Sequence, residues 1–197
     1  VKKTEAEPGH MVVLDTVKKR RSIRDFEERH IPEGVLENLV EALRWAPSAG
    51  NLQSRKFFFV QNTAARKKLA AAVGNPDLLS RVRKAVKKVL KRSFVSRAPL
   101  VVVACADRRI SQKYGDRGVD LYSIQDAAAS VMNMMLVAHD LGLGSVWVGG
   151  FDESKVVEIL QLPENLRPVA LVPVGYPAEA PLPSARKEWE EIVEFIL

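Results

Sequence analysis

Cysteine is nearly absent from this sequence: Cys105 is the only one in 197 residues. A single thiol excludes an intramolecular disulfide framework and any zinc or iron–sulfur centre built on several cysteines. Long hydrophobic runs are missing too, because the longest, such as residues 98–106, fall short of the ~18 residues that a membrane-spanning helix needs. The chain also opens without a charged-then-apolar leader, and 47% of its residues are hydrophobic. We therefore expect a cytoplasmic globular protein with no membrane partner.

The first ten residues carry no periodic pattern, and Gly9-His10-Met11 resembles the junction of an expression tag with a natural start. We expect residues 1–10 to be tag-derived or disordered and residues 11–197 to form a single domain, the usual number at this length. The histidines His10, His30 and His139 lack the spacing of metal ligands, so no metal site is expected.

The formal net charge is +6, from 30 Lys and Arg against 24 Asp and Glu. Such a balance favours an anionic partner, and nucleic acid, a phosphorylated cofactor and an acidic substrate all fit it. The best case for nucleic acid is a basic helix expected over residues 80–97, because residues 80–106 hold eight basic residues and no acidic one. Phe94 is the only aromatic residue among these charges and no recognised binding motif accompanies them, so a solvated helix face is the favoured interpretation.

Hydrophobic periodicity predicts helices and short strands in mixed order, which is typical of an α+β fold with a sheet layered between helices. A proline-rich, extended segment over residues 177–183 and a short amphipathic piece over residues 188–197 end the chain. This tail has little to pack against on its own chain, and we expect it to wrap a second subunit. The predicted helices span residues 11–21, 35–45, 63–73, 78–92, 119–141 and 153–160, and the predicted strands span residues 56–60, 100–106, 145–148 and 169–174.

A basic segment, residues 18–24, follows the first predicted helix and holds three arginines and Ser22 within five residues. Forked guanidinium donors suit a phosphate monoester better than ammonium groups do. Taken alone, the segment is equally typical of a solvated helix end.

Two loops offer polar backbone and amide groups. Residues 46–53 combine Pro, Ser, Gly, Asn and Gln between a helix and a strand, which fits either a ligand contact or an ordinary turn. Gly149 and Gly150 directly follow the predicted strand 145–148 and can leave N–H groups free for a ligand, or can form a tight turn with Asp152 as helix cap. A dinucleotide fingerprint starting at Gly142 fails because its third glycine falls at Trp147.

Taken together and in order, these segments resemble the nitroreductase family of FMN-dependent oxidoreductases. The resemblance extends from about Met11 to the C-terminus. It is carried by Arg20-Arg21-Ser22-Ile23-Arg24-Asp25-Phe26, Ala46-Pro47-Ser48-Ala49-Gly50-Asn51-Leu52-Gln53, Gln125-Asp126-Ala127-Ala128-Ala129, the run from Leu141 to Phe151, and Arg186.

The resemblance implies an α+β sandwich with a central, mainly antiparallel sheet and a C-terminal arm exchanged in a homodimer, with FMN in the interface. In that family the basic segment and the tail arginine hold the FMN phosphate, the Pro-Ser-x-x-Asn loop lies against the flavin, often from the partner subunit, and backbone N–H groups approach flavin N5. The cofactor-binding residues implied are Arg20, Arg21, Ser22, Ile23, Arg24, Pro47, Ser48, Ala49, Asn51, Gly149, Gly150 and Arg186.

The resemblance also implies that a hydride passes from NADH or NADPH through flavin N5 to a nitroaromatic, a quinone or a similar small acceptor by alternating, ping-pong kinetics. A specialised flavoenzyme of the same fold, for dehalogenation or flavin-consuming biosynthesis, is the alternative, and nucleic-acid binding through residues 80–97 is the third. The sequence departs from the family pattern at Ser54-Arg55, where Pro-Trp is frequent, and at Gly149, where some members have glutamate.

Overall fold

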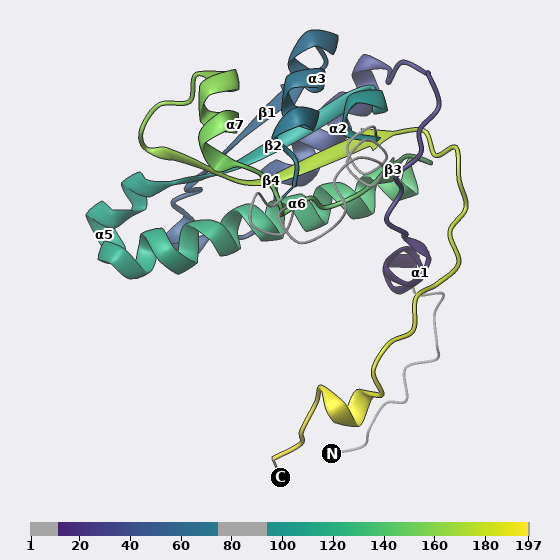
Figure 1. Ribbon diagram of the computed structural model, residues 1–197. Coiled ribbons are helices and arrows are strands. Elements are labelled where there is room, and N and C mark those ends of the chain that lie inside the picture. The colour runs from purple at the N-terminus through teal and green to yellow at the C-terminus, as the bar shows by residue number, and fades with distance from the viewer. Residues whose placement is uncertain (1–11, 75–93, 197) are drawn as a thin grey trace, which may run out of the picture.

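The computed structural model describes residues 12–74 and 94–196. Helices lie on both sides of one antiparallel sheet with the strand order β1-β2-β4-β3 (Figure 1). The strands are β1 (Arg55–Val60), β2 (Leu100–Asp107), β3 (Gly144–Ser145) and β4 (Leu166–Gly175), and the helices are α1 (Val12–Lys19), α2 (Glu33–Arg44), α3 (Thr63–Ala72), α5 (Ser111–Arg117), α6 (Ser123–Asp140) and α7 (Glu153–Leu160). Short 3-10 or π turns cover Ala49–Asn51, Arg108–Ile110, Gly118–Tyr122 and Trp189–Glu191.

The sheet separates two apolar cores. All eight residues of β2 are buried, as its continuous apolar sequence predicts for a strand covered on both faces. Successive β2 side chains point to opposite faces of the sheet. Val101 and Val103 pack with α3 and α7 on one face, whereas Val102 and Ala104 pack with α2 and α6 on the other. The long helix α6 runs beneath one face of the sheet, and α3 and α7 cover the other (Figure 1). The predicted α+β class with an antiparallel sheet is confirmed.

Two predicted elements differ from the structure. The strand expected over residues 145–148 pairs regularly only at Gly144–Ser145, with one further bridge between Val148 and Leu171. Val146 donates its N–H to the carbonyl of Pro173 at 3.3 Å, but Pro173 has no N–H to donate in return, so the ladder is interrupted there. The helix α5 was not predicted.

The predicted cap of α7 is confirmed, because the Asp152 side chain accepts from the Lys155 N–H.

The chain leaves the body after β4 as an extended tail that passes α1, forms the turn Trp189–Glu191 and continues to residue 196 (Figure 1). Most of the basic helix predicted over residues 80–97 lies outside the described residues; only residues 94–97 are seen, and they are helical. None of the helices in residues 12–74 and 94–196 has the length and apolar character that crossing a bilayer requires.

Candidate functional site

The basic segment after α1 is held against the short strand β3. Ile23 donates its N–H to the Ser145 carbonyl at 3.0 Å, and Ser22 and Ser145 form a parallel bridge. A Cβ on Gly144 would lie only 2.6 Å from Cγ1 of Ile23. Because atoms cannot approach so closely, glycine at 144 is what allows the segment to lie on the strand.

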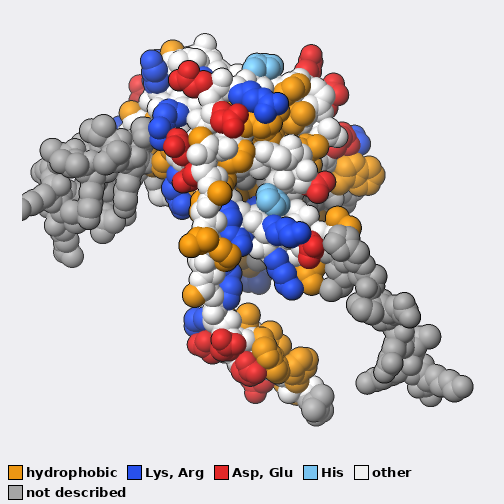
Figure 2. Space-filling view, turned by 90° about the vertical axis from the view of Figure 1, so that its right-hand side faces the viewer, with side chains coloured by type: hydrophobic (Ala, Val, Ile, Leu, Met, Phe, Trp, Pro, Cys, Tyr) orange, Lys and Arg blue, Asp and Glu red, His pale blue; other side chains and the backbone are white. Residues whose placement is uncertain are grey.

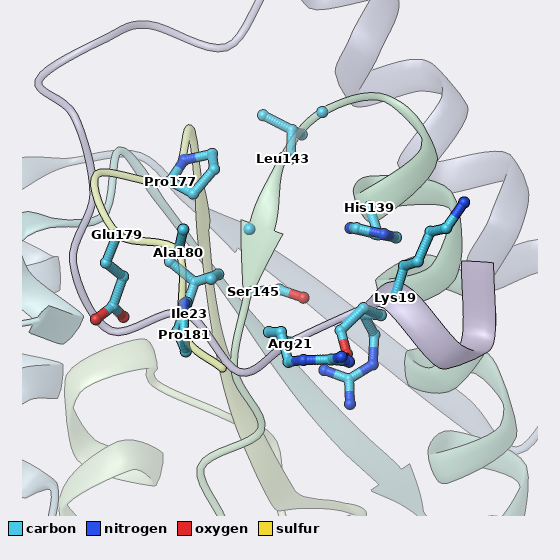
Figure 3. Close-up of a pocket in the computed structure, with 13 residues that line it drawn as sticks. Lys19, Arg21, Ile23, His139, Leu143, Ser145, Pro177, Glu179, Ala180 and Pro181 are labelled. Carbon is cyan, nitrogen blue, oxygen red and sulfur yellow. The ribbon is translucent and has the colours of Figure 1, made fainter. Parts of the chain in front are cut away.

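A cavity of about 390 Å³ opens between this segment, the end of α6 and the start of the tail. Figure 3 shows Lys19, Arg21 and His139 on one side of it and Pro177, Glu179 and Ala180 on the other. We call it the basic cavity. Its lining residues are Lys19, Arg20, Arg21, Ile23, His139, Gly142, Leu143, Gly144, Ser145, Pro177, Glu179, Ala180 and Pro181.

Arg20 is the most unusual residue of the basic cavity. Its Nη1 atom is buried and has no hydrogen-bond partner among the described residues. Burial lowers the pKa of its guanidinium, and the nearby charges of Arg21 and Arg186 lower it further. A buried donor without an acceptor is costly, and repulsion from two further cations adds to that cost. The arrangement therefore favours an anion in the cavity.

Arg21 lines the basic cavity, whereas Arg186 of the tail lies outside its lining but close enough for its charge to lower the pKa of Arg20. Arg21 uses Nη1 to cap the end of α1, donating to the carbonyls of Lys18 at 2.6 Å and Arg20 at 2.8 Å. Arg186 donates to the Ser184 and Ala185 carbonyls and is otherwise exposed. The structure thus brings together three of the predicted arginines.

Arg24 is placed differently. Its side chain is exposed and does not line the basic cavity, and its backbone N–H donates to the carboxylate of Glu179, as does that of Asp25 at 3.1 Å. This pair of bonds ties the start of the tail to the basic segment. A role for the Arg24 side chain stays a prediction.

His139 is a cavity residue that the sequence did not reveal, since it has no metal-ligand spacing. It lies at the end of α6 and faces the basic segment (Figure 3). Burial lowers the pKa of its imidazole, followed by the charge of Arg20; Arg21 and Lys19 add to the effect, and Asp140 opposes it. The imidazole is therefore held in its neutral form near pH 7 and can take up a proton when an anion enters.

The loop containing Pro47, Ser48, Ala49 and Asn51 is fixed near the other end of α6. Ala49 donates its N–H to Oδ1 of Asp126 at 3.0 Å. Ser48 Oγ accepts the Gln53 N–H at 3.0 Å, and Gly50 and Asn51 both have φ of 55°, in the left-handed region. The positive φ of Asn51 is a departure that asparagine tolerates better than most residues.

Arg55 and Asp126 clamp this loop. The Arg55 guanidinium donates to the carbonyls of Ala46 at 2.7 Å and Pro47 at 2.8 Å, and burial lowers its pKa while Asp126 raises it. Asp126 is buried, and its Oδ2 atom has no partner within the described part of the chain. The frequent Pro-Trp of the family is replaced here by Ser54-Arg55, and the arginine gives the loop a second anchor.

Within one chain the loop and the basic cavity are far apart. Asp126, which holds the loop, and His139, which lines the cavity, are 13 residues apart in α6, about 20 Å along its axis. Figure 1 agrees, because α5 and α1 lie at opposite ends of the molecule. One chain therefore does not gather all of the predicted site residues around one cavity.

Gly149 and Gly150 lie on the same side as β3, further along β4. Both are exposed, and neither N–H has an acceptor among the described residues, whereas the Gly150 carbonyl accepts from Gly74 at 2.8 Å. Gly149 is four positions after Ser145 in the sequence, about 13 Å in an extended chain. Two free donors thus follow the basic cavity along one edge of the fold.

Comparison with known proteins decides the family. The profile of the nitroreductase family matches residues 17–176, most of the chain. This chain belongs to the nitroreductase family. It is 31% identical over 203 aligned positions to an NADH dehydrogenase of Thermus thermophilus, covering 89% of this chain and 91% of that protein.

Two further members of the family have names that mention a flavin. The FMN reductase (NADPH) of Bacillus subtilis is 25% identical over 179 positions, covering 84% of this chain and 66% of that protein. The structure of an NADPH:FMN oxidoreductase of Vibrio harveyi, complexed with NAD⁺, has a TM-score of 0.78 and 25% identity, covering 93% of this chain and 76% of that one. The predictions of the family and of an oxidoreductase enzyme are confirmed.

Two other kinds of site, a cysteine nucleophile and a metal centre, find no support in the described residues of this nitroreductase-family member. Cys105 is buried in β2, and burial raises the pKa of its thiol to about 12, so it is not a nucleophile. In residues 12–74 and 94–196 no group of His, Cys, Asp and Glu side chains has the arrangement of a metal site.

Proposed function

We propose that the chain is an FMN-dependent NAD(P)H oxidoreductase whose basic cavity holds the cofactor's phosphate. The observation that carries this proposal is the buried, unpartnered Nη1 of Arg20 beside Arg21 and Arg186. A phosphate monoester carries nearly two negative charges and three acceptor oxygens, which would satisfy this donor and remove the repulsion among the three cations. Ser22 would add a hydroxyl to the same group.

The chain segment that follows β3 from this cavity to Gly150 would accommodate the ribityl chain and the flavin ring of FMN. The exposed segment Gly149–Gly150 offers two free N–H groups about 13 Å from Ser145, a span of the order of an extended ribityl chain and the near part of a ring. We assign the backbone of these glycines to the flavin N5 side, with Ile23 and Arg24 along the path. When bound, FMN supplies the capacity to accept a hydride and pass it on. The protein's own part is to bind, to orient and to donate hydrogen bonds.

A homodimer would complete the site. The loop containing Pro47, Ser48, Ala49 and Asn51 lies about 20 Å from the basic cavity of its own chain, too far to contact the same cofactor. Two copies with their α6 helices side by side in opposite directions would bring the loop of each to the cavity of the other. Met132 on α6, Leu141 directly after α6 and Trp45 directly after α2 expose apolar side chains that such an interface would cover.

The tail supplies a second argument for two copies. Its last part exposes large apolar side chains, which Figure 2 shows gathered at its end, away from the body. Within the described part of the chain, β1 has one edge without a paired strand, next to a groove of about 340 Å³ lined in part by Val40, Leu43, Phe57 and Phe59. We assign this groove and edge to the tail of a second copy, which would pair its backbone there. The exposed tail residues are Leu182, Trp189, Ile192, Val193, Phe195 and Ile196.

A cofactor shared by both substrates would give alternating kinetics. NADH or NADPH would reduce the enzyme and leave, and a nitroaromatic, quinone or similar acceptor would then take its place. Names of relatives support both FMN and a nicotinamide donor. None of the assigned residues is needed as a general acid.

The test is reconstitution followed by reduction. The purified protein, mixed with FMN and passed through a desalting column, should keep about one FMN per chain and show flavin absorbance. Anaerobic NADH or NADPH should bleach it, and a quinone should restore the colour. Failure to retain FMN, or retention without reduction by either nicotinamide, would overturn the proposal.

A further inference from the structure

A second polar pocket lies beside the loop that Asp126 holds. It has a volume of about 350 Å³ and lies between residues 52–56 and the segment from Asp107 to Lys113. We call it the loop-side pocket. The loop over residues 46–53 is therefore held by the buried Asp126 at Ala49 and borders an open cationic pocket at Leu52 and Gln53.

Tyr114 and Lys113 of α5 reach the loop itself. A Cβ on Gly50 would lie 2.5 Å from Oη of Tyr114 and 3.1 Å from Nζ of Lys113. The absence of a side chain at Gly50 thus makes room for both groups directly over the loop. The Lys113 ammonium also lies 5.4 Å from the centre of the Tyr114 ring, which orients it.

The loop-side pocket has an unbalanced positive charge. Its one carboxylate, Asp107, accepts from Arg109 and Asn165 and is fully engaged by them. Lys56 and Lys113 also line the pocket. Among the described residues, no carboxylate forms an ion pair with either of these two ammonium groups.

Neutral hydrogen-bonding groups complete the lining. Gln53 and Gln112 both line the pocket, and Gln53 has a φ of 53°, a left-handed conformation unusual for glutamine. Its N–H bond to Ser48 Oγ holds the residue in that conformation. Amide and ammonium donors around a small pocket are suited to phosphate oxygens.

We propose that the loop-side pocket binds phosphate groups of the nicotinamide dinucleotide, with Lys113 and Lys56 as the charged contacts. This inference rests on the proposed function, because the loop is assigned to the flavin and a donor approaching the flavin must pass it. The phosphates are either the pyrophosphate, common to NADH and NADPH, or the 2′-phosphate of NADPH alone.

Binding without turnover tests the pocket directly. NADP⁺ is titrated into the oxidised protein and its dissociation constant is measured by calorimetry. The expected result is a weakening of about 10-fold in Lys113→Gln and more in Lys113→Gln with Lys56→Gln, since each variant removes a charge-assisted hydrogen bond. Lys68→Gln is the matched control, an equal change of charge on the exposed surface of α3, and should leave the constant unchanged.

Steady-state kinetics with NADPH, NADH and a phosphate-free donor show whether the pocket binds the pyrophosphate or the 2′-phosphate. KM should rise for NADPH and NADH alike if the pyrophosphate is bound, and for NADPH alone if the 2′-phosphate is bound. A dihydronicotinamide without phosphates, such as 1-benzyl-1,4-dihydronicotinamide, should reduce wild type and variants equally well. FMN content should be the same in all of them.

Unchanged NADP⁺ binding in the double variant, or an equal loss in Lys68→Gln, would overturn the inference. Equal losses with the phosphate-free donor would also overturn it, because they would place the lysines elsewhere in the reaction. Failure of the proposed function has a different signature: wild-type protein that keeps no FMN, or holds FMN that the phosphate-free donor does not reduce.

Discussion

The N–H of Ile23 donates to the carbonyl of Ser145 across 3.0 Å, and this bond joins the basic segment to the strand that leads toward Gly149. It sets the position of Arg20 beside the end of α6, where the tail arginine also arrives. Residues separated by more than a hundred positions in the sequence thereby form one cationic cavity.

Arg20→Gln should weaken FMN binding by about 10- to 100-fold, the range for loss of a charge-assisted hydrogen bond of about 1.5–3 kcal/mol. The same change should not lower the free energy of unfolding of the cofactor-free protein, because a buried donor without a partner is removed. Fluorescence titration and thermal unfolding measure the two effects. Lys18→Gln removes an equal charge outside the cavity lining and should leave FMN affinity nearly unchanged.

Gly144→Ala should disturb the same site through the backbone. The added methyl would overlap Ile23, so the basic segment must move away from β3. We expect FMN affinity to fall by at least 10-fold, measured in the same titration. Gly34→Ala is a suitable control, since a Cβ there meets nothing within 4 Å. An alanine at 144 without effect would contradict the assigned role of this close approach.

His139 should make FMN affinity depend on pH. In the free protein the pKa of His139 lies below its ordinary value of 6.5, mainly through burial and Arg20. A bound phosphate would raise that pKa, so binding takes up a proton. Affinity should therefore rise as pH falls through the pKa of the complex and level off below the pKa of the free protein.

His139→Gln isolates this contribution. The variant should lose the part of the pH dependence due to the imidazole and keep the part due to ionisation of the phosphate itself, which occurs near pH 6. Titrations between about pH 5.5 and 8 compare the two proteins. Parallel pH profiles for wild type and variant would show that His139 takes no part.

Much of the fold follows from local sequence, and the exceptions have physical causes. The continuous apolar run of β2 and the cap at Asp152 are visible in the sequence because each depends on neighbouring residues. The shortness of β3 is not visible there, because it depends on Pro173 in a strand distant in sequence. Likewise, His139 and Arg55 acquire their roles only when α6 and the loop are packed in place.

The predicted cofactor-binding residues also include some that local sequence indicates and some that depend on residues distant in the sequence. Local sequence indicates a basic segment, but its meeting with Arg186 came from the resemblance to a family. Neither source indicated that Arg24 would point away from the cavity lining or that Arg21 would cap α1. Both outcomes depend on where the tail and the helix end lie in space.

The loop clamp predicts an effect on stability. Asp126→Ala removes the acceptor of the Ala49 N–H and the charge that faces Arg55, and should lower the free energy of unfolding by about 1.5–3 kcal/mol. Denaturant unfolding measures it. Asp116→Ala, an exposed acid in α5, should change stability by less than about 0.5 kcal/mol.

The tail prediction concerns assembly. Trp189→Ser combined with Phe195→Ser should shift the protein from dimer toward monomer, because both rings are exposed within one chain and are assigned to a second copy. Sedimentation velocity measures the distribution. Glu190→Gln with Glu194→Gln changes the same segment without removing apolar surface and should remain dimeric. A wild-type protein that sediments as a monomer would contradict the assignment.

The most direct measurement compares FMN with riboflavin, which differs only by lacking the phosphate, in equilibrium titrations of the cofactor-free protein. The account predicts that FMN binds at least 100-fold more tightly than riboflavin in wild type, and that most of this difference disappears in Arg20→Gln. Equal affinity for FMN and riboflavin, or a difference that Arg20→Gln leaves intact, would contradict it.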